Sequence, residues 1–381
     1  MVSDTRPLSV TNTDNRIIAA TVSHAIMPAM LDLIDPSQEG FLNGRQGSDH
    51  VVDVNTFFFE GVESGDDRLL FLLDTAKAFD SIDHSWIHTV IKKTSFPPWF
   101  SHFVKGALRD VKVSPYFGKD TGVWIDIERG VKQGCPLSPL LFVLAYDPLL
   151  DKLRRFPSLN TYAFADDLAI ATSGSVDHIY PALTLISTFS EASGLGINRE
   201  KSLVLTTSPP SSHDDIRSAL LRSPWPDLPL RDRGTHLGVV IGRDVTLDEI
   251  WEAPVNTAIN RLNRARSFLR SLSVTNRIIY VNVFITSIFS YIGLFFVLPT
   301  DTWKVIKGHI SKAVIPYNGG AYTYESLVCR GVLYGVKPSL RDPWAFVISL
   351  LAVRSPLALS TANYGTFQTL GLFDVTGTLR Q

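Results

Sequence analysis

Two adjacent aspartates, Asp166 and Asp167, stand in the middle of an apolar stretch, "AFADDLAIAT" (residues 163–172). Neighbouring carboxylates repel each other, so each needs water or a cation close by. Aspartate is also a common turn residue, because its side chain can hydrogen-bond to the local backbone. The pair alone is therefore compatible with a solvated turn between two strands, and a metal site requires a further carboxylate.

Asp74 supplies that further carboxylate. It ends "RLLFLLD" (residues 68–74), a short apolar run that predicts a buried central strand. A charge at the end of a buried strand is costly unless it is solvated or paired with a cation. The runs on either side of Asp166 and Asp167 predict a tight hairpin with the aspartates at its turn. If the two elements lie side by side, the three carboxylates converge at one edge of a sheet.

A cluster that offers only carboxylate oxygens suits Mg²⁺, which is usually bound by one or two carboxylates together with substrate phosphates. Two such ions, about 3.5–4 Å apart, activate an attacking 3′-hydroxyl and stabilise the leaving pyrophosphate oxygen. The residues therefore favour nucleotidyl transfer.

Composition excludes several other classes of protein. The 381 residues carry a net charge of −1, so a nucleic-acid site would have to be locally basic. The two distant cysteines, Cys135 and Cys329, form no disulfide framework or zinc cluster, which favours the nucleus or the cytoplasm. The N-terminus lacks a signal-peptide pattern. Residues 278–299 are long enough to span a bilayer, but their polar side chains favour a buried helix, so no membrane partner is expected.

The elements around the aspartates divide the chain into an α+β part and a mostly helical part, with a boundary near residue 245. Asp83 is expected to cap a helix, Gly194 to end one, and Asp80 to lie at a helix start. Helices are predicted over residues 12–34, 47–63, 84–93, 99–109, 136–156 and 176–193, with a short one inside 208–234. Strands are predicted over residues 161–164, 168–172, 201–207 and 235–242, and a hairpin over 111–130.

Several stretches in order along the chain resemble the palm motifs of reverse transcriptases, most closely those of non-LTR (LINE-like) retrotransposons. They are "FLLDTAKAFDSIDH", "RGVKQGCPLSPLLF", "YAFADDLAI", "GLGINREKS" and "HLGVVIG". Upstream, "RPLSVTNTDNRIIA" and "QEGFLNGRQGSDHVV" resemble the fingers motifs of that family, and "FLRSLSVTNRIIYVN" and "YIGLFFVLP" resemble its thumb. Viral RNA-dependent RNA polymerases typically have Gly-Asp-Asp where this chain has Ala-Asp-Asp, which weighs against that class of polymerase.

The resemblance implies a right-hand polymerase fold with fingers, a palm built on an antiparallel sheet, and a mostly helical thumb. Fingers are expected over residues 1–66, incomplete at the N-terminus. The palm is expected over 67–245, with 85–130 partly in the fingers. The thumb and a C-terminal extension are expected over 246–381.

The resemblance also implies roles for individual residues. Asp74, Asp166 and Asp167 would be the catalytic metal ligands, with two Mg²⁺ ions that Mn²⁺ can replace. Phe79 would crowd the 2′ position of the incoming nucleotide, where a hydroxyl distinguishes ribonucleotides. Gln133 would lie against the nucleotide, and Gly134 would permit close approach of the backbone.

Basic residues complete the implied site. Arg6 and Arg16 would hold the triphosphate, with Arg45 as a further candidate, because a guanidinium suits bidentate phosphate contacts. Lys201 would donate a proton to pyrophosphate. His236, Leu237 and Gly238 match the primer grip, with His236 in place of a frequent tyrosine. Arg264, on a helix with Arg261, Arg266 and Arg270, would follow the template–primer backbone.

The implied activity is that of an RNA-directed DNA polymerase, which extends a DNA primer with dNTPs along an RNA template for retrotransposition. Two alternatives remain open. One is a domesticated or intron-type reverse transcriptase with the same chemistry. The other is a non-catalytic or decayed RNA-binding relic, against which the intact set of Asp74, Asp166 and Asp167 argues.

Overall fold

The computed structural model describes residues 9–94, 96–116, 118, 122–174, 176–315, 322–329 and 338–358. The chain forms two compact units, Met1–Arg243 and Asp244–Gln381. The first combines helices with a central sheet, and the described residues of the second are helical. The expectation of an α+β part followed by a helical part is therefore confirmed.

A five-stranded sheet forms the centre of the first unit, in the order β4-β5-β1-β6-β7. Its central strand β1 (Arg68–Asp74) pairs antiparallel with β5 (Asp167–Ser173) and with β6 (Leu203–Thr206). The outer strands are β4 (Leu159–Phe164) and β7 (Leu230–Arg231). The predicted strand at residues 68–74 and the predicted hairpin around Asp166 are confirmed.

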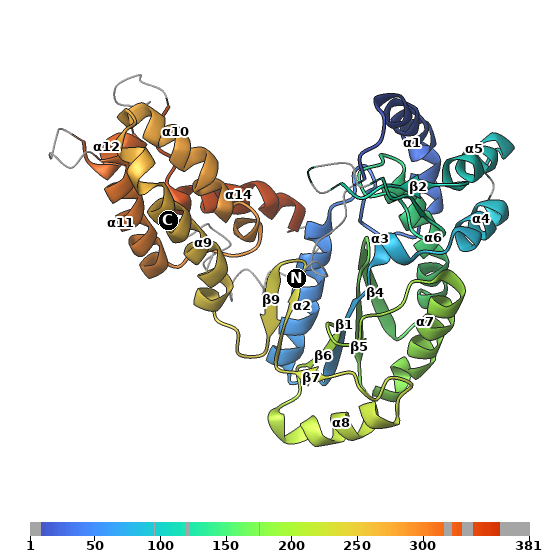
Figure 1. Ribbon diagram of the computed structural model, residues 1–381. Coiled ribbons are helices and arrows are strands. Elements are labelled where there is room, and N and C mark those ends of the chain that lie inside the picture. The colour runs from blue at the N-terminus through green and yellow to red at the C-terminus, as the bar shows by residue number, and fades with distance from the viewer. Residues whose placement is uncertain are drawn as a thin grey trace. The chain divides into compact units, whose positions relative to one another are not determined.

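Helices cover both faces of the sheet, which is why β1 is apolar on both sides. One face of β1 packs into the large core with α6 (Ser138–Leu153) and α7 (Tyr180–Ser193). The other face packs against α2 (Gly47–Ser64) and β9 (Val239–Gly242). Figure 1 shows the sheet between α2 on one side and α6 and α7 on the other.

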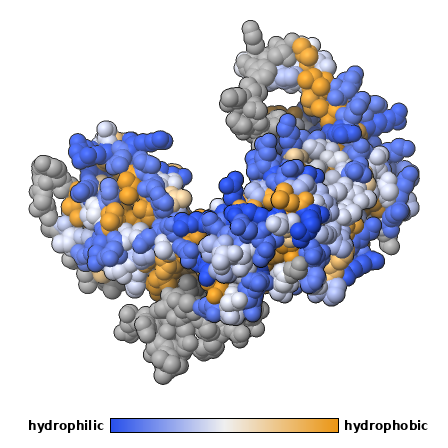
Figure 2. Space-filling model, turned by 90° about the horizontal axis from the view of Figure 1, so that it is seen from below, coloured by the Kyte–Doolittle hydropathy of each residue, from blue (hydrophilic) through white to orange (hydrophobic). Residues whose placement is uncertain are grey.

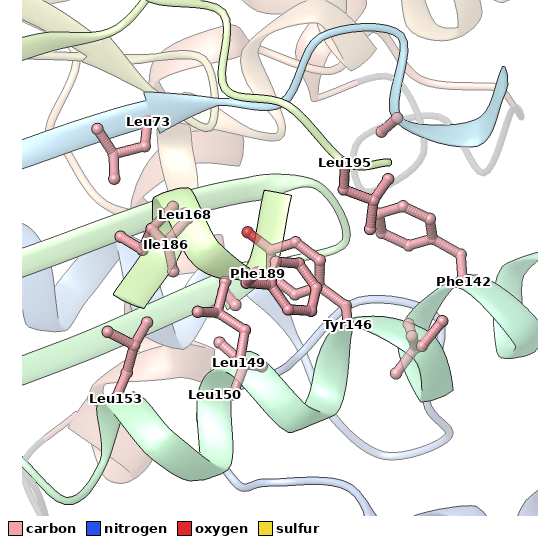
Figure 3. Packing of buried hydrophobic residues seen from close by; sticks show 14 of the residues in the cluster. Leu73, Phe142, Tyr146, Leu149, Leu150, Leu153, Leu168, Ile186, Phe189 and Leu195 are labelled. Atoms are coloured by element: carbon pink, nitrogen blue, oxygen red, sulfur yellow. The ribbon is translucent and has the colours of Figure 1, made fainter. Parts of the chain in front are cut away.

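The core on the α6 side is built from aliphatic and aromatic side chains of consecutive helical turns. Tyr146 and Phe189 meet edge to face, with ring centroids 5.7 Å apart. In Figure 3, the side chains of α6 and α7 gather beneath Leu73 of β1 and Leu168 of β5. This packing fixes the carboxyl end of β1 and the start of β5, which are the ends that carry the aspartates.

Most of the predicted helices of the first unit are confirmed. Asp83 caps α4 by accepting a hydrogen bond from the backbone N–H of Ser85 at 2.7 Å, and Gly194 ends α7 in the left-handed conformation. The remaining helices are α1 (Thr13–Leu33), α3 (Ala78–Ser81), α4 (His84–Lys93), α5 (Pro98–Leu108) and α8 (His213–Arg222), with 3₁₀ turns η2 (Val176–Ile179) and η3 (Pro210–Ser212). The hairpin expected at 111–130 is reduced to the short strands β2 (Lys112–Val113) and β3 (Ile125–Asp126).

The single strand predicted over residues 235–242 is wrong. The chain instead folds there into a hairpin of β8 (Arg233–His236) and β9, with Leu237 and Gly238 between the strands. Both of these residues have positive φ angles, 45° and 79°. Such a two-residue turn matches the twist of a hairpin, and the glycine lowers the cost of forming it.

The second unit begins with α9 (Leu247–Arg270), whose start is fixed by a capping box between Thr246 and Glu249. It continues with α10 (Val274–Phe284), the 3₁₀ turns η4 (Thr286–Phe289) and η5 (Ile292–Leu294), and helices α11 (Thr300–Val314), α12 (Tyr324–Val328) and α14 (Pro343–Ala358). Trp251 is fully buried and donates its indole N–H to the carbonyl of Val297 at 2.8 Å.

The apolar stretch at 278–299 does not form the single buried helix that was expected. The helix ends at Phe284, two 3₁₀ turns follow, and the side chains of Ile279, Val283 and Phe284 are exposed. Among the described helices, only Thr13–Leu33 is long and apolar enough to cross a membrane. In its most apolar 18 residues, 17% are buried inside the protein. Hydrophobic residues form separate patches on the largely hydrophilic face drawn in Figure 2.

Candidate active site

Strand pairing brings the predicted carboxylates together. In the antiparallel pair of β1 and β5, Asp74 lies directly opposite Asp167. Residues opposite each other in such a pair point to the same face, with Cβ atoms about 5 Å apart. Asp166 is in the turn that joins β4 to β5, next to Asp167. Asp166 and Asp167 follow Asp74 by 92 and 93 positions in the sequence, and the strand pairing brings all three to the same edge of the sheet.

The face on which Asp74 and Asp167 lie follows from strand alternation. Leu70 and Leu72 point to the α2 side, where they pack with Ala169 and Ala171, and Asp74 continues this series. Whereas Leu70 and Leu72 are buried, all three aspartates are only half-buried. The α2 side of the sheet is therefore covered along its length and accessible at the end that carries the carboxylates.

The donor set fits a divalent cation by its chemistry. All three side chains offer hard carboxylate oxygens, and Mg²⁺ usually takes only one or two carboxylates, with water and phosphate oxygens in its other positions. Among the described residues, no group of three or more His, Cys, Asp or Glu side chains is gathered closely enough to hold a metal ion.

A phenol lies close to the aspartate turn on the other side of the sheet. Tyr146 of α6 is almost completely buried. Burial raises the pKa of its hydroxyl above the ordinary value, and the negative charges of Asp166 and Asp167 raise it further. The phenol therefore stays neutral and adds no negative charge to an edge that already has three carboxylates.

Backbone contacts fix Asp74 at the end of β1. Its N–H donates to the Ser202 hydroxyl at 3.0 Å, and its carbonyl accepts from the Asn198 N–H at 2.7 Å. The next residue, Thr75, is buried and donates its hydroxyl to the carbonyl of Asp166 at 3.0 Å. Ser202 thus holds the backbone of Asp74, and Thr75 ties the end of β1 to the aspartate turn.

Phe79 lies in an aromatic group at the start of the helical segment after β1. Its ring stacks on Phe142, with centroids 4.8 Å apart, and meets Phe41 edge to face at 5.9 Å. Its side chain is only partly buried. The ring is therefore held from two sides, which suits a rigid wall better than a mobile side chain.

Gln133 and Gly134 lie in the loop before α6. The side-chain Nε2 of Gln133 donates to the Asp80 carboxylate at 3.2 Å. The backbone carbonyl of Gln133 accepts from the Ser9 N–H at 2.9 Å. Gly134 has a φ of 100°, and a Cβ there would come within 3.1 Å of the Ser9 carbonyl oxygen. Asp80 lies in the first turn of the short helix α3, as expected. Its carboxylate orients the Gln133 side chain through this hydrogen bond.

The three candidate arginines of the fingers differ in their surroundings. Arg6 lies outside the described residues. Arg16 is exposed on the first turn of α1. Arg45 donates to four backbone carbonyls at 2.7–3.2 Å, those of Leu31, Ile34, Asp35 and Gln38. Because its guanidinium already holds the end of α1 and the following loop, the expectation that Arg45 binds triphosphate is replaced by a structural role.

Replacing Arg45 by Met should lower the free energy of unfolding by about 3 kcal/mol, because four carbonyls lose a charged donor. Arg45→Lys should recover only part of this, since an ammonium cannot reach all four oxygens in one plane. Chemical denaturation gives the measurement. The exposed Arg16→Met is the matched control and should leave stability unchanged. Equal stability of Arg45→Met and the unmodified chain would contradict the structural role.

Lys201 and Arg264 are exposed. Lys201 lies in the loop that holds Asp74, and its N–H donates to the Asn198 side chain at 3.4 Å. Arg264 belongs to α9 of the second unit, together with Arg261, Arg266 and Arg270, which are also exposed. Lys201 is thus connected to the carboxylate site through Asn198.

His236 points into the protein at the end of β8, next to the Leu237–Gly238 turn. It is 4% exposed. Burial lowers the pKa of His236 to about 4, and burial together with His236 lowers the pKa of His50 to about 4. Glu39 Oε1 lies 3.6 Å from His50 Nε2. Burial, and next the negative charge of Asp49, raise the pKa of Glu39 to about 7. The His236 imidazole is therefore buried and neutral near pH 7.

This burial predicts an acid-sensitive hairpin. The pKa of His236 is lower in the folded chain than in the unfolded chain, so the unfolded chain takes up the proton first as the pH falls. The stability contributed by neutral His236 is complete above about pH 6.5 and is lost towards about pH 4. Between pH 6.5 and pH 5, the unmodified chain should lose about 1 kcal/mol more stability than His236→Leu.

Urea denaturation at both pH values measures this difference. Comparison with the variant cancels the contributions of groups that do not interact with His236, and the weaker depression of the His50 pKa in the variant adds to the difference in the same direction. A variant of the exposed His24, His24→Leu, should follow the unmodified chain. If His236→Leu loses as much stability on acidification as the unmodified chain, His236 is not held neutral by the fold.

Four residues next to the site had no predicted role. Thr75, Asn198 and Ser202 hold the backbone around Asp74, and Gln38 contacts the aspartate turn. Asn198 and Ser202 lie inside the "GLGINREKS" motif with Lys201, so the motif was a signal that sequence reasoning could have used. Gln38 is the first residue of the "QEGFLNGRQGSDHVV" motif, but its partner Ala165 lies 127 positions away, and the motif does not indicate that contact.

The sheet is antiparallel except for the parallel pair of β6 and β7. Carboxylates at the paired ends of its central strand and hairpin, with helices on both faces, are the architecture of a right-hand polymerase palm. The family model for reverse transcriptases (RNA-dependent DNA polymerases) matches residues 2–241. The chain belongs to the reverse transcriptase family.

Curated relatives agree with this assignment. The chain is 25% identical over 297 residues to the "Transposon TX1 uncharacterized 149 kDa protein" of Xenopus laevis, covering 75% of this chain and 22% of that protein. It is 29% identical over 223 residues to a Pol polyprotein from the type-1 retrotransposable element R2 of Popillia japonica, covering 54% and 30%. The resemblance to non-LTR retrotransposon reverse transcriptases is therefore confirmed. The chain spans less than a third of the length of these relatives.

A solved structure is also similar. The telomerase from Candida tropicalis in complex with a fragment of telomeric RNA aligns with a TM-score of 0.47 at 14% identity, covering 92% of this chain and 55% of that one.

Proposed function

We propose that this chain extends the 3′-hydroxyl of a DNA primer with dNTPs along an RNA template, as the polymerase part of a non-LTR retrotransposon protein. The observation that carries the proposal is the register that sets Asp74 opposite Asp167, with Asp166 in the adjoining turn. Family membership supports the same chemistry. The proposed division is fingers over 1–66, palm over 67–245 and thumb over 246–381.

Asp74 and Asp166 would hold both Mg²⁺ ions, and Asp167 would be the third carboxylate; Mn²⁺ would substitute. When bound, such a pair of ions activates the primer hydroxyl and offsets charge on the leaving pyrophosphate. The chain itself supplies the fixed edge of the sheet, because β1 and β5 are paired over their full length. The pairing fixes the backbone positions of Asp74 and Asp167, and their side chains would close around the ions on binding.

Other residues would bind the substrates. Phe79 would exclude the 2′-hydroxyl, and Gln133 with Gly134 would border the nucleotide. Arg6 and Arg16 would contact the triphosphate, and Lys201 would protonate pyrophosphate. The turn at His236, Leu237 and Gly238 would support the primer end through its backbone, since the His236 side chain is buried. Arg264 would contact the template–primer backbone, and the chain would act in the nucleus or the cytoplasm.

Primer extension tests the proposal directly. The purified chain should extend a labelled DNA primer on an RNA template with dNTPs and Mg²⁺, and Mn²⁺ should also support the reaction. Absence of extension with both metals would reject the proposal for this chain. Binding of the template without extension would favour the non-catalytic RNA-binding alternative.

A further inference from the structure

A loop that follows α1 runs along the edge of β4 next to the aspartate turn. Ala163 of β4 donates its N–H to the Ser37 carbonyl at 2.8 Å and accepts from the Glu39 N–H at 2.9 Å. Gln38 forms a parallel bridge with Ala163 between these bonds. The loop thereby extends the sheet by a short edge segment, which brings the side chain of Gln38 to the end of β4.

The side chain of Gln38 forms hydrogen bonds with the aspartate turn. Its Oε1 accepts from the Ala165 N–H at 2.8 Å, and its Nε2 donates to the Ala165 carbonyl at 3.2 Å. Oε1 also accepts from the Gly40 N–H at 2.8 Å. Gln38 has no exposed surface. A buried amide that satisfies both backbone groups of one residue fixes the position and the orientation of that residue.

The residue held in this way has an unfavourable conformation. Ala165 is buried and has a φ of 56°, in the left-handed region. A residue with a Cβ adopts this region at a cost of about 1–2 kcal/mol. The turn therefore needs support from outside the hairpin, and Gln38 gives it at Ala165 as Thr75 does at the Asp166 carbonyl.

Gly40 shows how closely the loop and the turn are fitted. A Cβ at this position would lie 2.3 Å from the Ala165 nitrogen and 2.9 Å from Gln38 Oε1. Any side chain at Gly40 would therefore push the turn away. The glycine is needed for space, at a place where the loop backbone contacts the backbone immediately before Asp166.

A purely structural role for Gln38 within its own loop accounts for only one of its three side-chain bonds, the one to Gly40. The loop is held independently by Arg45, which binds the carbonyls of Asp35 and Gln38, and by the backbone bonds to Ala163. The other two side-chain bonds of Gln38 leave the loop and end on Ala165.

We propose that Gln38 is a positioning residue for catalysis: its amide fixes the left-handed Ala165 and thereby sets where the Asp166 and Asp167 carboxylates stand relative to Asp74. The inference rests on the proposed polymerase function of these carboxylates. Gln38 acts through the turn and touches no reacting atom.

Three variants separate positioning from stability. Gln38→Met keeps the size of the side chain and removes all three bonds. Gly40→Ala keeps Gln38 and displaces the turn. Asn55→Leu is the matched control, because Asn55 is also a buried amide of this unit but donates only within α2, to Val51. Each variant is compared with the unmodified chain by chemical denaturation, by primer-extension kinetics and by titration with Mn²⁺ followed by electron paramagnetic resonance.

Gln38→Met and Gly40→Ala should lower kcat about tenfold or more, since small misplacements of catalytic groups have effects of this size. The KM for dNTP should change by less than about twofold, because the nucleotide contacts stay in place. The dissociation constant for Mn²⁺ should rise several-fold. Asn55→Leu should leave kcat and Mn²⁺ affinity unchanged, whatever its effect on stability.

If Gln38→Met changes kcat and Mn²⁺ affinity no more than Asn55→Leu does, Gln38 is structural and the inference is overturned. If the unmodified chain does not extend primers, the proposed function fails by itself, and the Mn²⁺ titration still decides on Gln38. Equal Mn²⁺ dissociation constants for the unmodified chain and Gln38→Met would then overturn the inference, and so would absence of Mn²⁺ binding by the unmodified chain.

Discussion

Asp166→Asn should reduce primer extension by a factor of about a thousand or more while the chain stays folded. The substitution keeps the size of the side chain and removes one negative charge from the edge where Asp74 and Asp167 stand opposite each other. A neutral amide is a weak ligand for Mg²⁺, which prefers charged oxygens. Asp74→Asn should have an effect of the same size. Extension rates with and without the substitution give the measurement.

Stability provides a second readout for the same variants. Removing one of three like charges should leave the free energy of unfolding unchanged or slightly higher in the absence of Mg²⁺. Addition of Mg²⁺ should stabilise the unmodified chain, because a ligand that binds only the folded state shifts the equilibrium towards it. Asp166→Asn should lose this gain. Thermal unfolding with and without Mg²⁺ separates loss of the metal site from loss of the fold.

Asp67→Asn is the matched control for this experiment. Asp67 is an exposed aspartate just before β1, and its carboxylate accepts from the Ser208 hydroxyl at 2.5 Å. It precedes the strand that Asp74 ends, so it lies at the opposite end of β1. The variant should keep both extension and stabilisation by Mg²⁺. Equal extension by Asp166→Asn and the unmodified chain would remove Asp166 from the catalytic site.

Phe79→Ala should weaken the preference for dNTPs over ribonucleotides by about 10–100-fold, measured as the ratio of their kcat/KM values. The ring of Phe79 is held in place by stacking on Phe142 and by the edge-to-face contact with Phe41. In its proposed role the Phe79 ring stands against the sugar and excludes a 2′-hydroxyl, whereas a methyl group in its place would leave room for one. The kcat/KM for ribonucleotides should rise, and the kcat/KM for dNTPs should change less.

Two further variants test whether the effect belongs to the Phe79 ring. Phe79→Tyr keeps the ring and should keep the sugar preference. Phe142→Leu removes the stacking partner on the buried side, so it loosens the aromatic group without removing the wall. It should lower stability and leave most of the preference. If Phe142→Leu and Phe79→Ala change the preference equally, general loosening of the aromatic group explains the effect.

Local sequence signals predicted the individual elements well where they depend on neighbouring residues. The apolar run that ends at Asp74, the cap at Asp83 and the stop at Gly194 were each legible from a few adjacent residues. The stretch at 235–242 was read as one strand because its apolar alternation continues across Leu237 and Gly238. The reversal there depends on positive φ at both residues, and leucine gives no signal for that conformation.

The role of Arg45 shows the limit of reasoning by residue type. A guanidinium in a loop suits phosphate binding as well as it suits backbone carbonyls, because both offer oxygens in a plane. Only the fold shows that Leu31, Ile34, Asp35 and Gln38 direct their carbonyls at it. The chemistry of the side chain was clear from the sequence, whereas its partner was not.

The sequence by itself determined the chemistry of this protein: three carboxylates in motifs of a characteristic order, on a strand end and a hairpin turn, belong to a reverse transcriptase. The tertiary structure decided how those carboxylates are held. The register of Asp74 with Asp167, and the grip of Gln38 on Ala165 across 127 residues, are set by strand pairing and buried hydrogen bonds. Such contacts join segments that lie far apart in the chain, and the motifs that contain these residues do not indicate which of them pair.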